Sequence, residues 1–293
     1  MKEVFGDFIA MLDQRLLRAF VAIADARSFT LAAERLNMTQ STISQQLARL
    51  EEAVGAALID RAARPVEPTT TGERLLGYAR RILALQEEAE AALGDPAGTT
   101  SIRIGVPEDI VTSAMAAVFS DFARRHRTIR LDVTAGLSRD LTRRYRAGEF
   151  DIVIVKEPSA DPSCRATYPE AMAWFESADG SGEWLNPIPL VTFPPGGLYR
   201  EAMFQRIEQE QRRWYIAFSG SSLHSVLVAV EGGIGLSLLP KSAVAGYRVR
   251  QCMAFGAEPE MAVSIYSWES AGPGAELLEQ MSAVLAARGA AHG

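Results

Sequence analysis

The sequence contains few of the residues that build metal sites, disulfide frameworks or membrane spans. Its two cysteines, Cys164 and Cys252, lie far apart without CxxC spacing, and its three histidines show no ligand spacing. We therefore expect no disulfide framework and no metal site, and we expect the reducing cytoplasm as the compartment. No run of 18 apolar residues occurs, so no transmembrane helix is expected. Residues 1–10 lack the apolar core and cleavage site of a signal peptide, and we expect none.

Positive charge is also scarce, because the chain carries a net charge of −6 and its pI is about 5.3. These values argue against indiscriminate binding to polyanions, although net charge does not describe a local patch. The rest of the composition is ordinary for a soluble globular protein, with 48% apolar and 23% charged residues. A length of 293 residues is enough for about two domains with buried cores.

The first helices are predicted from apolar spacing and capping residues. Apolar residues recur at helical intervals over 12–24, and a second helical run follows Ser28. Thr39 is the expected N-cap of a third helix that runs to Val54, because its hydroxyl can accept from free backbone N–H groups. Gly55 then suits the left-handed position that ends a helix.

The segment LIDRAARPVEPTT after this helix predicts two short exposed strands, since Pro65 and Pro68 exclude a central strand. Three helices followed by such a wing describe a winged helix-turn-helix. We assign it to residues 12–70, after an N-terminal extension at 1–11.

A long helix over 71–94 follows, and its apolar residues alternate by three and four, as in a heptad seam. This pattern favours a dimerisation helix, although a helix packed only on its own domain would also be apolar on one face. The helix leads into a polar hinge at 95–100. The predicted seam comprises Leu75, Tyr78, Ile82, Leu85, Ala89 and Ala92.

From Ser101 onward, strand-like and helical segments alternate, which predicts βαβ units and a parallel sheet. We expect an α/β module with two lobes that close on a ligand like a clam. Lobe I is predicted to comprise 101–158 and 268–293, with the terminal helix returning to it, and lobe II to comprise 159–267.

Several short motifs occur one after another between Leu12 and Leu76. TQSTISQQ opens the third helix, a glycine ends it, DR and RPV lie in the wing, and TTTG enters the long helix. In this order they resemble the LysR-type transcriptional regulators. The segments IRIGVPED, RAGEFDIVIV and AVEGGIGLSLLP resemble the effector domain of that family more loosely, so the resemblance covers nearly the whole chain from Leu12.

This resemblance implies a winged helix-turn-helix, a dimerising linker helix and an effector domain like a periplasmic binding protein. It also implies a tetramer built as a dimer of dimers. The sequence departs from the family pattern at Ile59, where phenylalanine is frequent. It departs again at Glu67 and Pro68, where a basic or apolar wing residue is more usual.

The opening of the third helix carries the predicted DNA contacts. Glutamine amides suit adenine, and hydroxyls suit bases or phosphates, when a recognition helix enters the major groove. By resemblance, base readout is assigned to Gln40, Ser41, Ser44 and Gln45, and wing contacts to Arg61 and Arg64. The full predicted set is Ser28, Thr30, Thr39, Gln40, Ser41, Thr42, Ser44, Gln45, Arg49, Arg61 and Arg64. Two alternatives remain open, a merely capped and solvated helix start, and an ion pair of Arg61 with Asp60 or a helix end.

Between Leu12 and Thr70, seven arginines balance seven acidic residues. Phosphate contacts normally supply much of the affinity for DNA, so one such neutral domain is expected to bind weakly. Several copies on spaced half-sites would then be needed. Because each released phosphate contact contributes about 0.9 log unit to the salt dependence, we expect a shallower dependence than for a basic helix-turn-helix.

Effector contacts are expected beyond the carboxyl ends of the strands, between the lobes. Helix N-termini and hydroxyls there suit a carboxylate, whereas Glu108 and Asp109 suit an ammonium group, so an organic acid or an amino acid is the expected ligand class. The alternative is that Asp109 and Ser221 only cap helices. The predicted effector-binding residues are Pro107, Glu108, Asp109, Gly136, Ser138, Pro194, Ser219, Ser221 and Ser222.

No catalytic residues are predicted, since the nearby Ser–His spacing around His224 lacks a nucleophile elbow and an orienting acid. GGIGLSLLP does not match a dinucleotide fingerprint, and we expect no cofactor.

The sequence therefore predicts a cytoplasmic, non-enzymatic LysR-type regulator. Its expected partners are double-stranded promoter DNA, a small-molecule effector, further copies in a homodimer or homotetramer, and RNA polymerase, with no membrane. The alternatives are an effector-independent repressor, or a solute-binding or catalytic α/β module fused to a DNA-binding domain.

Overall fold

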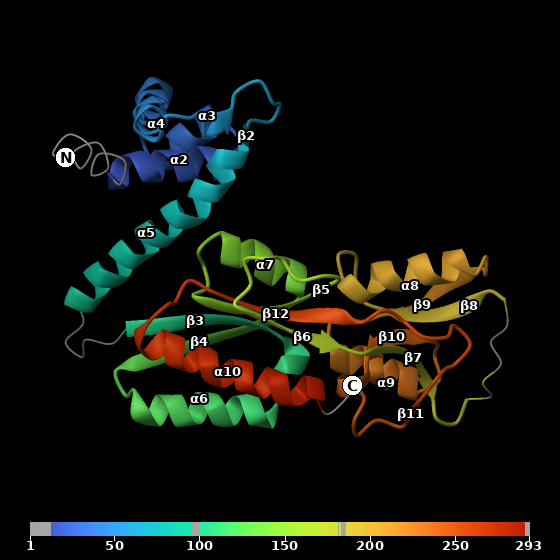
Figure 1. The fold of residues 1–293 in the computed structure, drawn as a ribbon. Helices are drawn as coiled ribbons and strands as arrows, with labels where there is room; N and C mark the ends of the chain where they lie inside the picture. Colours follow the sequence, from blue (N-terminus) through green and yellow to red (C-terminus); the bar gives the residue numbers. More distant parts are fainter. Residues whose placement is uncertain (1–12, 95–99, 181, 183–185, 291–293) are drawn as a thin grey trace. The chain divides into compact units, whose positions relative to one another are not determined.

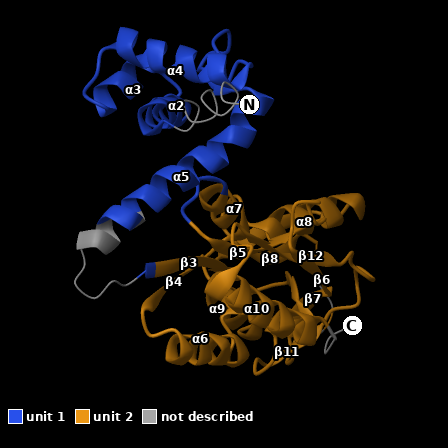
Figure 2. Cartoon of the chain, turned by 60° about the vertical axis from the view of Figure 1, so that its left-hand side comes forward, with its two compact units in different colours: residues 1–100, 146–149 blue, residues 101–145, 150–293 orange. Residues whose placement is uncertain are grey.

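The computed structural model describes residues 13–94, 100–180, 182 and 186–290. The chain divides into two compact units, one of residues 1–100 with 146–149 and one of residues 101–145 with 150–293 (Figure 2). Among the described residues, no helix is both long enough and apolar enough to cross a membrane.

The first unit is a winged helix-turn-helix whose helix limits follow the predicted caps. Thr39 accepts a hydrogen bond from the backbone N–H of Thr42, and Gly55 ends the third helix in the left-handed conformation with φ 74°. The two wing strands pair antiparallel, as predicted, with Ile59 opposite Pro68. The elements are α2 (Gln14–Ala26), α3 (Phe29–Arg35), α4 (Gln40–Val54), β1 (Ile59–Asp60), β2 (Glu67–Pro68) and α5 (Thr70–Gly94).

The core of this unit forms because α2 and α4 each turn one apolar face inward. Its fully buried side chains include Phe20, Ile23 and Leu47, and Ile59 is also buried. Isoleucine at 59 is therefore a core residue in place of the phenylalanine frequent in the family, and burying a branched side chain of this size stabilises the fold by about 1.5–3 kcal/mol.

Helix α5 uses its apolar residues in two ways. Ala79 and Leu83 are buried in the core of their own unit, and Ile82 packs against it in part. Tyr78 and Leu85 instead remain 59% and 46% exposed. Packing on its own domain therefore accounts for one face of α5, and the exposed face stays available for the predicted dimer seam. The side chain of Ala92 lies outside the described residues.

Lobe I of the second unit contains a five-stranded sheet with strand order β4-β3-β5-β12-β6. Its central strand β5 alternates, since Ile152 and Ile154 face the core under α6 and α10, while Val153 and Val155 pack with Leu141 of α7. Helices α6 and α10 thus cover one face of the sheet and α7 the other (Figure 1). The elements are β3 (Thr100–Pro107), α6 (Ser113–Arg125), β4 (Ile129–Gly136), α7 (Ser138–Arg146), β5 (Ile152–Glu157), β6 (Ala166–Glu170), β12 (Met261–Ser267) and α10 (Gly272–Ala290).

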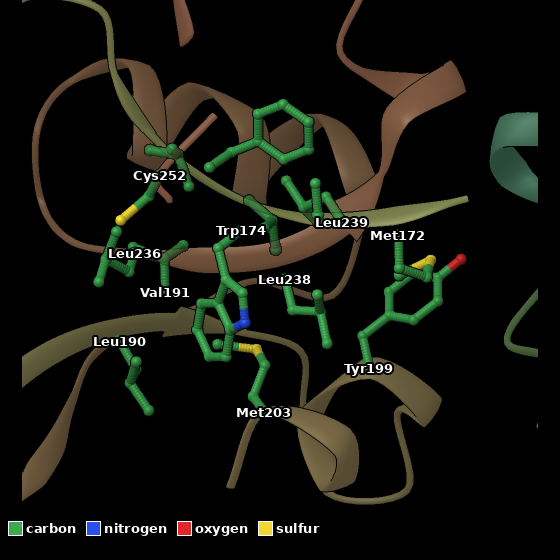
Figure 3. Packing of buried hydrophobic residues seen from close by; sticks show 14 of the residues in the cluster. Met172, Trp174, Leu190, Val191, Tyr199, Met203, Leu236, Leu238, Leu239 and Cys252 are labelled. Carbon is green, nitrogen blue, oxygen red and sulfur yellow. The ribbon is translucent and has the colours of Figure 1, made fainter. Parts of the chain in front are cut away.

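Lobe II is built around Trp174, which is fully buried beside Met203 of α8 (Figure 3). It contains a three-stranded sheet of order β10-β7-β11 and a parallel pair, β8 and β9. A bridge between Leu190 and Leu236 connects the two. The elements are β7 (Met172–Ser177), β8 (Ile188–Thr192), α8 (Leu198–Gln209), β9 (Trp214–Ser219), α9 (Leu223–Glu231), β10 (Ser237–Pro240) and β11 (Val249–Gln251).

The predicted lobe boundaries are wrong for two strands. β6 and β12 lie within the range 159–267 that was predicted as lobe II, but β12 pairs antiparallel with both β5 and β6 in the lobe I sheet. The chain therefore crosses between lobes after Glu170 and again before Met261. Apolar periodicity shows that a segment is a strand, whereas the choice of sheet depends on partners far away in the sequence. The expectation of a parallel sheet holds for β3 with β5 and for β8 with β9, whereas β12 is antiparallel to both of its neighbours.

Candidate functional site

A hollow of about 460 Å³ opens on the winged helix-turn-helix where α3, α4 and the wing meet. Its location follows from the caps, because Ser28 begins α3 and Thr39 begins α4. Six of the predicted DNA contacts come together there, from three separate segments. The lining residues are Arg27, Ser28, Phe29, Thr30, Gln40, Ser44, Arg61, Arg64, Pro65 and Val66.

The other predicted DNA contacts lie beside the hollow. The Thr39 hydroxyl is 2.8 Å from the hydroxyls of both Ser41 and Thr42, so these three side chains form one hydrogen-bonded group at the start of α4. Gln45 and Arg49 are exposed farther along the same helix. Capping is therefore correct for Thr39 and for Ser28, which accepts from Leu31 N. Base readout by the exposed glutamines stays a prediction.

The wing is attached to the recognition helix through Glu51. Its Oε1 accepts hydrogen bonds from the backbone N–H groups of Leu58 at 2.9 Å and Ile59 at 3.3 Å, and its Oε2 pairs with Arg61 at 2.8 Å. The Arg61 guanidinium also lies 5.6 Å from the ring centroid of Phe29. The alternative of an ion pair near a helix end is thus correct for Arg61, with Glu51 as the partner.

A second candidate site is a pocket of about 370 Å³ between the two lobes. It includes Pro107, Glu108, Asp109, Gly136, Ser138 and Ser221 from the predicted effector set. Pro194, Ser219 and Ser222 are not among its lining residues. The lining is completed by Ala135, Leu137, Lys156, Phe193, Gly197, Leu198, Tyr199 and Leu223.

Hydrogen bonds decide which residues cap the helices beside the pocket. Ser222 caps α9 by exchanging hydrogen bonds with Ser225, so the cap is Ser222 and not Ser221. The Nδ1 of His224 lies 2.7 Å from the Tyr247 hydroxyl. Asp109 is not a cap either, because Thr112 caps α6.

Four charged side chains, two of them buried, form a cluster at the wall of the pocket. Lys156 pairs with Asp109 and, at 2.9 Å, with Glu170. Arg288 from α10 lies 2.7 Å from Asp109 and 3.3 Å from Glu170, and it also donates to Ser242 at 2.7 Å. Lys156 and Glu170 are only 2% and 4% exposed. Two cations and two carboxylates balance, as the burial of charge requires.

The cluster favours the ionised forms of Asp109 and Lys156. Burial alone would raise the pKa of Asp109, but Lys156 and Arg288 hold that pKa below its usual range. Burial alone would lower the pKa of Lys156, and the Asp109 carboxylate is the largest influence that raises it instead. Asp109 therefore lines the pocket with its charge already balanced. Lys156 was not predicted from the sequence, although its position at the end of the strand IVIVK could have identified it.

Glu108, unlike Asp109, forms a hydrogen bond to the opposite lobe. Its Oε2 accepts a hydrogen bond at 3.0 Å from the backbone N–H of Leu223, the first residue of α9. Since α9 belongs to lobe II and Glu108 to lobe I, this bond links the lobes. Arg139 of α7 and Glu201 of α8 form a second, exposed link at 3.2 Å. A larger groove of about 760 Å³ between α6 and α10 has mainly apolar walls and few polar groups that would orient a small ligand.

Comparison with known proteins agrees with this arrangement. Residues 14–73 match the family model of the bacterial regulatory helix-turn-helix proteins of the lysR family. Residues 97–266 match that of the LysR substrate binding domain, which alone spans more than half of the chain. The chain belongs to the LysR family.

Relatives in the LysR family cover most of the chain. It is 30% identical to the HTH-type transcriptional regulator DgdR of Burkholderia cepacia, over 80% of this chain and 79% of the relative. It is also 30% identical to PecT of Dickeya dadantii, over 78% of this chain and 72% of the relative. The crystal structure of ArgP from Mycobacterium tuberculosis has the same fold, with a TM-score of 0.56, 22% identity and coverage of 94% and 96% of the two chains.

Membership of the LysR family establishes the general function. The chain is a transcriptional regulator with a DNA-binding helix-turn-helix and an effector-binding substrate domain. The resemblance stated from the sequence is therefore confirmed, as is the fold class.

Proposed function

We propose that the hollow between α3, α4 and the wing faces promoter DNA and that the interlobe pocket holds the effector. The observation that carries the first assignment is the convergence of Ser28, Gln40, Ser44 and Arg64 from three segments on one open surface. Such a surface offers amide and hydroxyl groups to base edges and guanidinium groups to phosphates.

Within this surface, the start of α4 carries base readout. Gln40 and Gln45 are exposed amides that can bond an adenine through two atoms, and Ser41 and Ser44 lie between them on the helix. Ser28 and Thr30, at the start of α3, are assigned to phosphate. Arg64 approaches the minor groove from the wing, and its guanidinium is oriented by hydrogen bonds to the carbonyl groups of Arg61 and Ala63.

The effector is proposed to be a small organic acid or an amino acid. A volume of about 370 Å³ suits a molecule of this size. The Leu223 N–H at the start of α9 is a donor for a carboxylate, and it is already bound to the Glu108 carboxylate in the structure. An effector carboxylate would take the place of Glu108, and the released Glu108 would suit an ammonium group.

The same hydrogen bond supports a second candidate function, an effector-independent repressor whose pocket is permanently occupied by its own side chain. In either case the chain acts on DNA as a regulator and not as an enzyme, and the cytoplasm, which holds its DNA partner, is its proposed location. Thermal unfolding measured with a panel of organic acids and amino acids separates the candidates, because only a binding pocket gives a ligand-dependent rise in Tm.

The DNA assignment is tested by a footprint on the DNA that flanks the gene, for the full chain and for Gln45→Ala. We expect protection by both proteins, with a preference between operator variants that is weaker for Gln45→Ala by about 1–3 kcal/mol at the base pair it reads. A Gln45→Ala protein that discriminates between operator variants as well as the parent does would exclude Gln45 from base readout. Absence of protection at low salt would contradict the assignment of the surface.

A further inference from the structure

Three arginines line the DNA-facing hollow, and two of them already have a carboxylate partner on the same surface. Arg61 pairs with Glu51 at 2.8 Å, and Arg27 pairs with Glu67 of the wing at 3.2 Å. Arg64 instead donates to backbone carbonyl groups. Carboxylates thus occupy guanidinium groups that phosphates would otherwise contact.

The two pairs differ in how firmly the carboxylate is held. Glu51 is only 16% exposed and also accepts two backbone hydrogen bonds, so it cannot leave Arg61 without breaking the attachment of the wing. Arg27 and Glu67 are 57% and 49% exposed. An ion pair this exposed contributes little to stability, and a phosphate can replace Glu67 at Arg27 at small cost to the fold.

We propose that Glu67 is a built-in competitor of DNA phosphate at Arg27, and that the exchange of Glu67 for phosphate sets the affinity and the salt dependence of DNA binding. This inference rests on the proposed DNA-facing surface. It assigns a role to the position at which the wing departs from its family pattern.

The local charges around Glu67 give the exchange an electrostatic cost in the parent protein. Glu67 lies directly opposite Asp60 in the two-stranded wing, and like charges in that position repel each other. Asp60 is held by the backbone N–H of Ala62, whereas Glu67 is balanced by Arg27. When phosphate takes Arg27, Glu67 is left without its cation, between Asp60 and the DNA.

The exchange also explains a shallow salt dependence. A phosphate neutralised by a free arginine releases about 0.9 counterion to the solution. When the arginine first has to leave a carboxylate, that carboxylate remains beside the DNA as an added negative charge, which holds counterions near the phosphates and offsets their release. Arg27 in the parent protein therefore adds a contact with almost no contribution to the salt slope.

The test measures binding of the full chain to two labelled duplexes by fluorescence anisotropy over a range of NaCl concentrations. One duplex is the DNA flanking the gene, and the other has the same length and a mixed sequence. The variants are Glu67→Gln, Arg27→Gln and the double variant. The matched control is Glu87→Gln, which removes the same charge from an exposed position on α5 outside the hollow.

Glu67→Gln is expected to bind both duplexes roughly fivefold more tightly at low salt, with a slope steeper by about 0.9 for each bound domain. The gain should be equal for the two sequences, because phosphates carry no sequence information. Adding Arg27→Gln should remove both effects, and Glu87→Gln should match the parent. The inference is wrong if Glu67→Gln matches the parent, if Glu87→Gln has the same effect, or if the gain persists without Arg27.

Failure of the inference is distinguishable from failure of the proposed surface. If the parent binds DNA, Arg64→Ala weakens binding and Glu67→Gln changes nothing, the surface is correct and only the role of Glu67 is refuted. If Arg64→Ala and Glu67→Gln both bind like the parent, DNA contacts another part of the unit and both proposals are refuted.

Discussion

Glu51 of the recognition helix and Arg61 of the wing form an ion pair at 2.8 Å, and the same carboxylate accepts hydrogen bonds from two wing N–H groups. One side chain therefore fixes the angle between the two elements that are proposed to face the DNA. The wing has only two residues in each strand, so its own ladder is too short to hold this geometry.

We expect Glu51→Ala to lower the free energy of unfolding of the winged unit by about 2 kcal/mol, because it leaves two partly buried N–H groups without an acceptor. All four tryptophans follow residue 170, so tryptophan fluorescence would not report this loss. Hydrogen–deuterium exchange of the peptide covering 56–69 is the suitable measurement, and it should become faster. Glu52→Ala, at the exposed neighbouring position, is the control and should leave the exchange rate unchanged. If the peptide exchanges as slowly in Glu51→Ala as in the parent, the role of Glu51 is refuted.

Removal of Lys156 should strongly destabilise the second unit. Lys156→Met leaves Asp109 and Glu170 with Arg288 as their remaining partner in the cluster, and breaking a buried ion pair in this way costs about 3–5 kcal/mol. Asp109→Asn in the same chain restores the balance of charge and should recover part of the loss. Urea unfolding followed by tryptophan fluorescence measures both variants. A Lys156→Met protein as stable as the parent would show that Lys156 does not stabilise the fold through its ion pairs with Asp109 and Glu170.

The same cluster gives the second unit a defined dependence on pH. The pKa of Asp109 is lower in the folded protein than its ordinary value of 3.8, so its stabilisation is present above that value and is lost as the pH falls through the folded pKa. Urea midpoints should therefore be constant near neutral pH and decline in strong acid. Without Lys156 the pKa of Asp109 should rise, and the decline should begin at higher pH in Lys156→Met. An unchanged acid profile would contradict this coupling.

The exposed face of α5 should carry the dimer contact. Leu85→Glu places a charge on the predicted seam at a position that is 46% exposed within its own unit, so folding should be preserved while association is weakened. Sedimentation velocity should show a shift toward smaller species at a given concentration. Gln86→Glu is the control, because it adds the same charge at the exposed neighbouring position. It should leave the distribution of sedimentation coefficients unchanged. If both variants sediment like the parent, α5 does not form the seam.

The link between Glu108 and Leu223 should respond to small carboxylates. Glu108→Ala removes the carboxylate from the start of α9, and we expect the second unit to lose about 1 kcal/mol. Sodium acetate should raise the Tm of Glu108→Ala more than that of the parent, compared with chloride at equal ionic strength. Glu201→Ala removes the exposed Arg139–Glu201 link between the lobes without altering α9, and acetate should have no special effect on it. Equal responses to acetate in all three proteins would refute the carboxylate position.

The sequence by itself determined the local features of this protein. Thr39 and Gly55 predicted the limits of the recognition helix, because capping depends on one hydroxyl and on one residue able to adopt positive φ. Pro65 and Pro68 predicted the exposed wing for a similar local reason. The order of these motifs was sufficient for the family resemblance, and thereby for the class of function.

Tertiary structure decided every feature that depends on partners distant in the chain. Pairing with β5 and β6 places β12 in lobe I, although its position in the sequence predicted lobe II. It brought Arg288 to Asp109, and it brought Glu67 to Arg27. In each case the sequence shows that a strand or a charge is present, but its partner is determined by how the chain packs. Whether a carboxylate is free to bind a ligand or is already neutralised therefore becomes known only once the fold is formed.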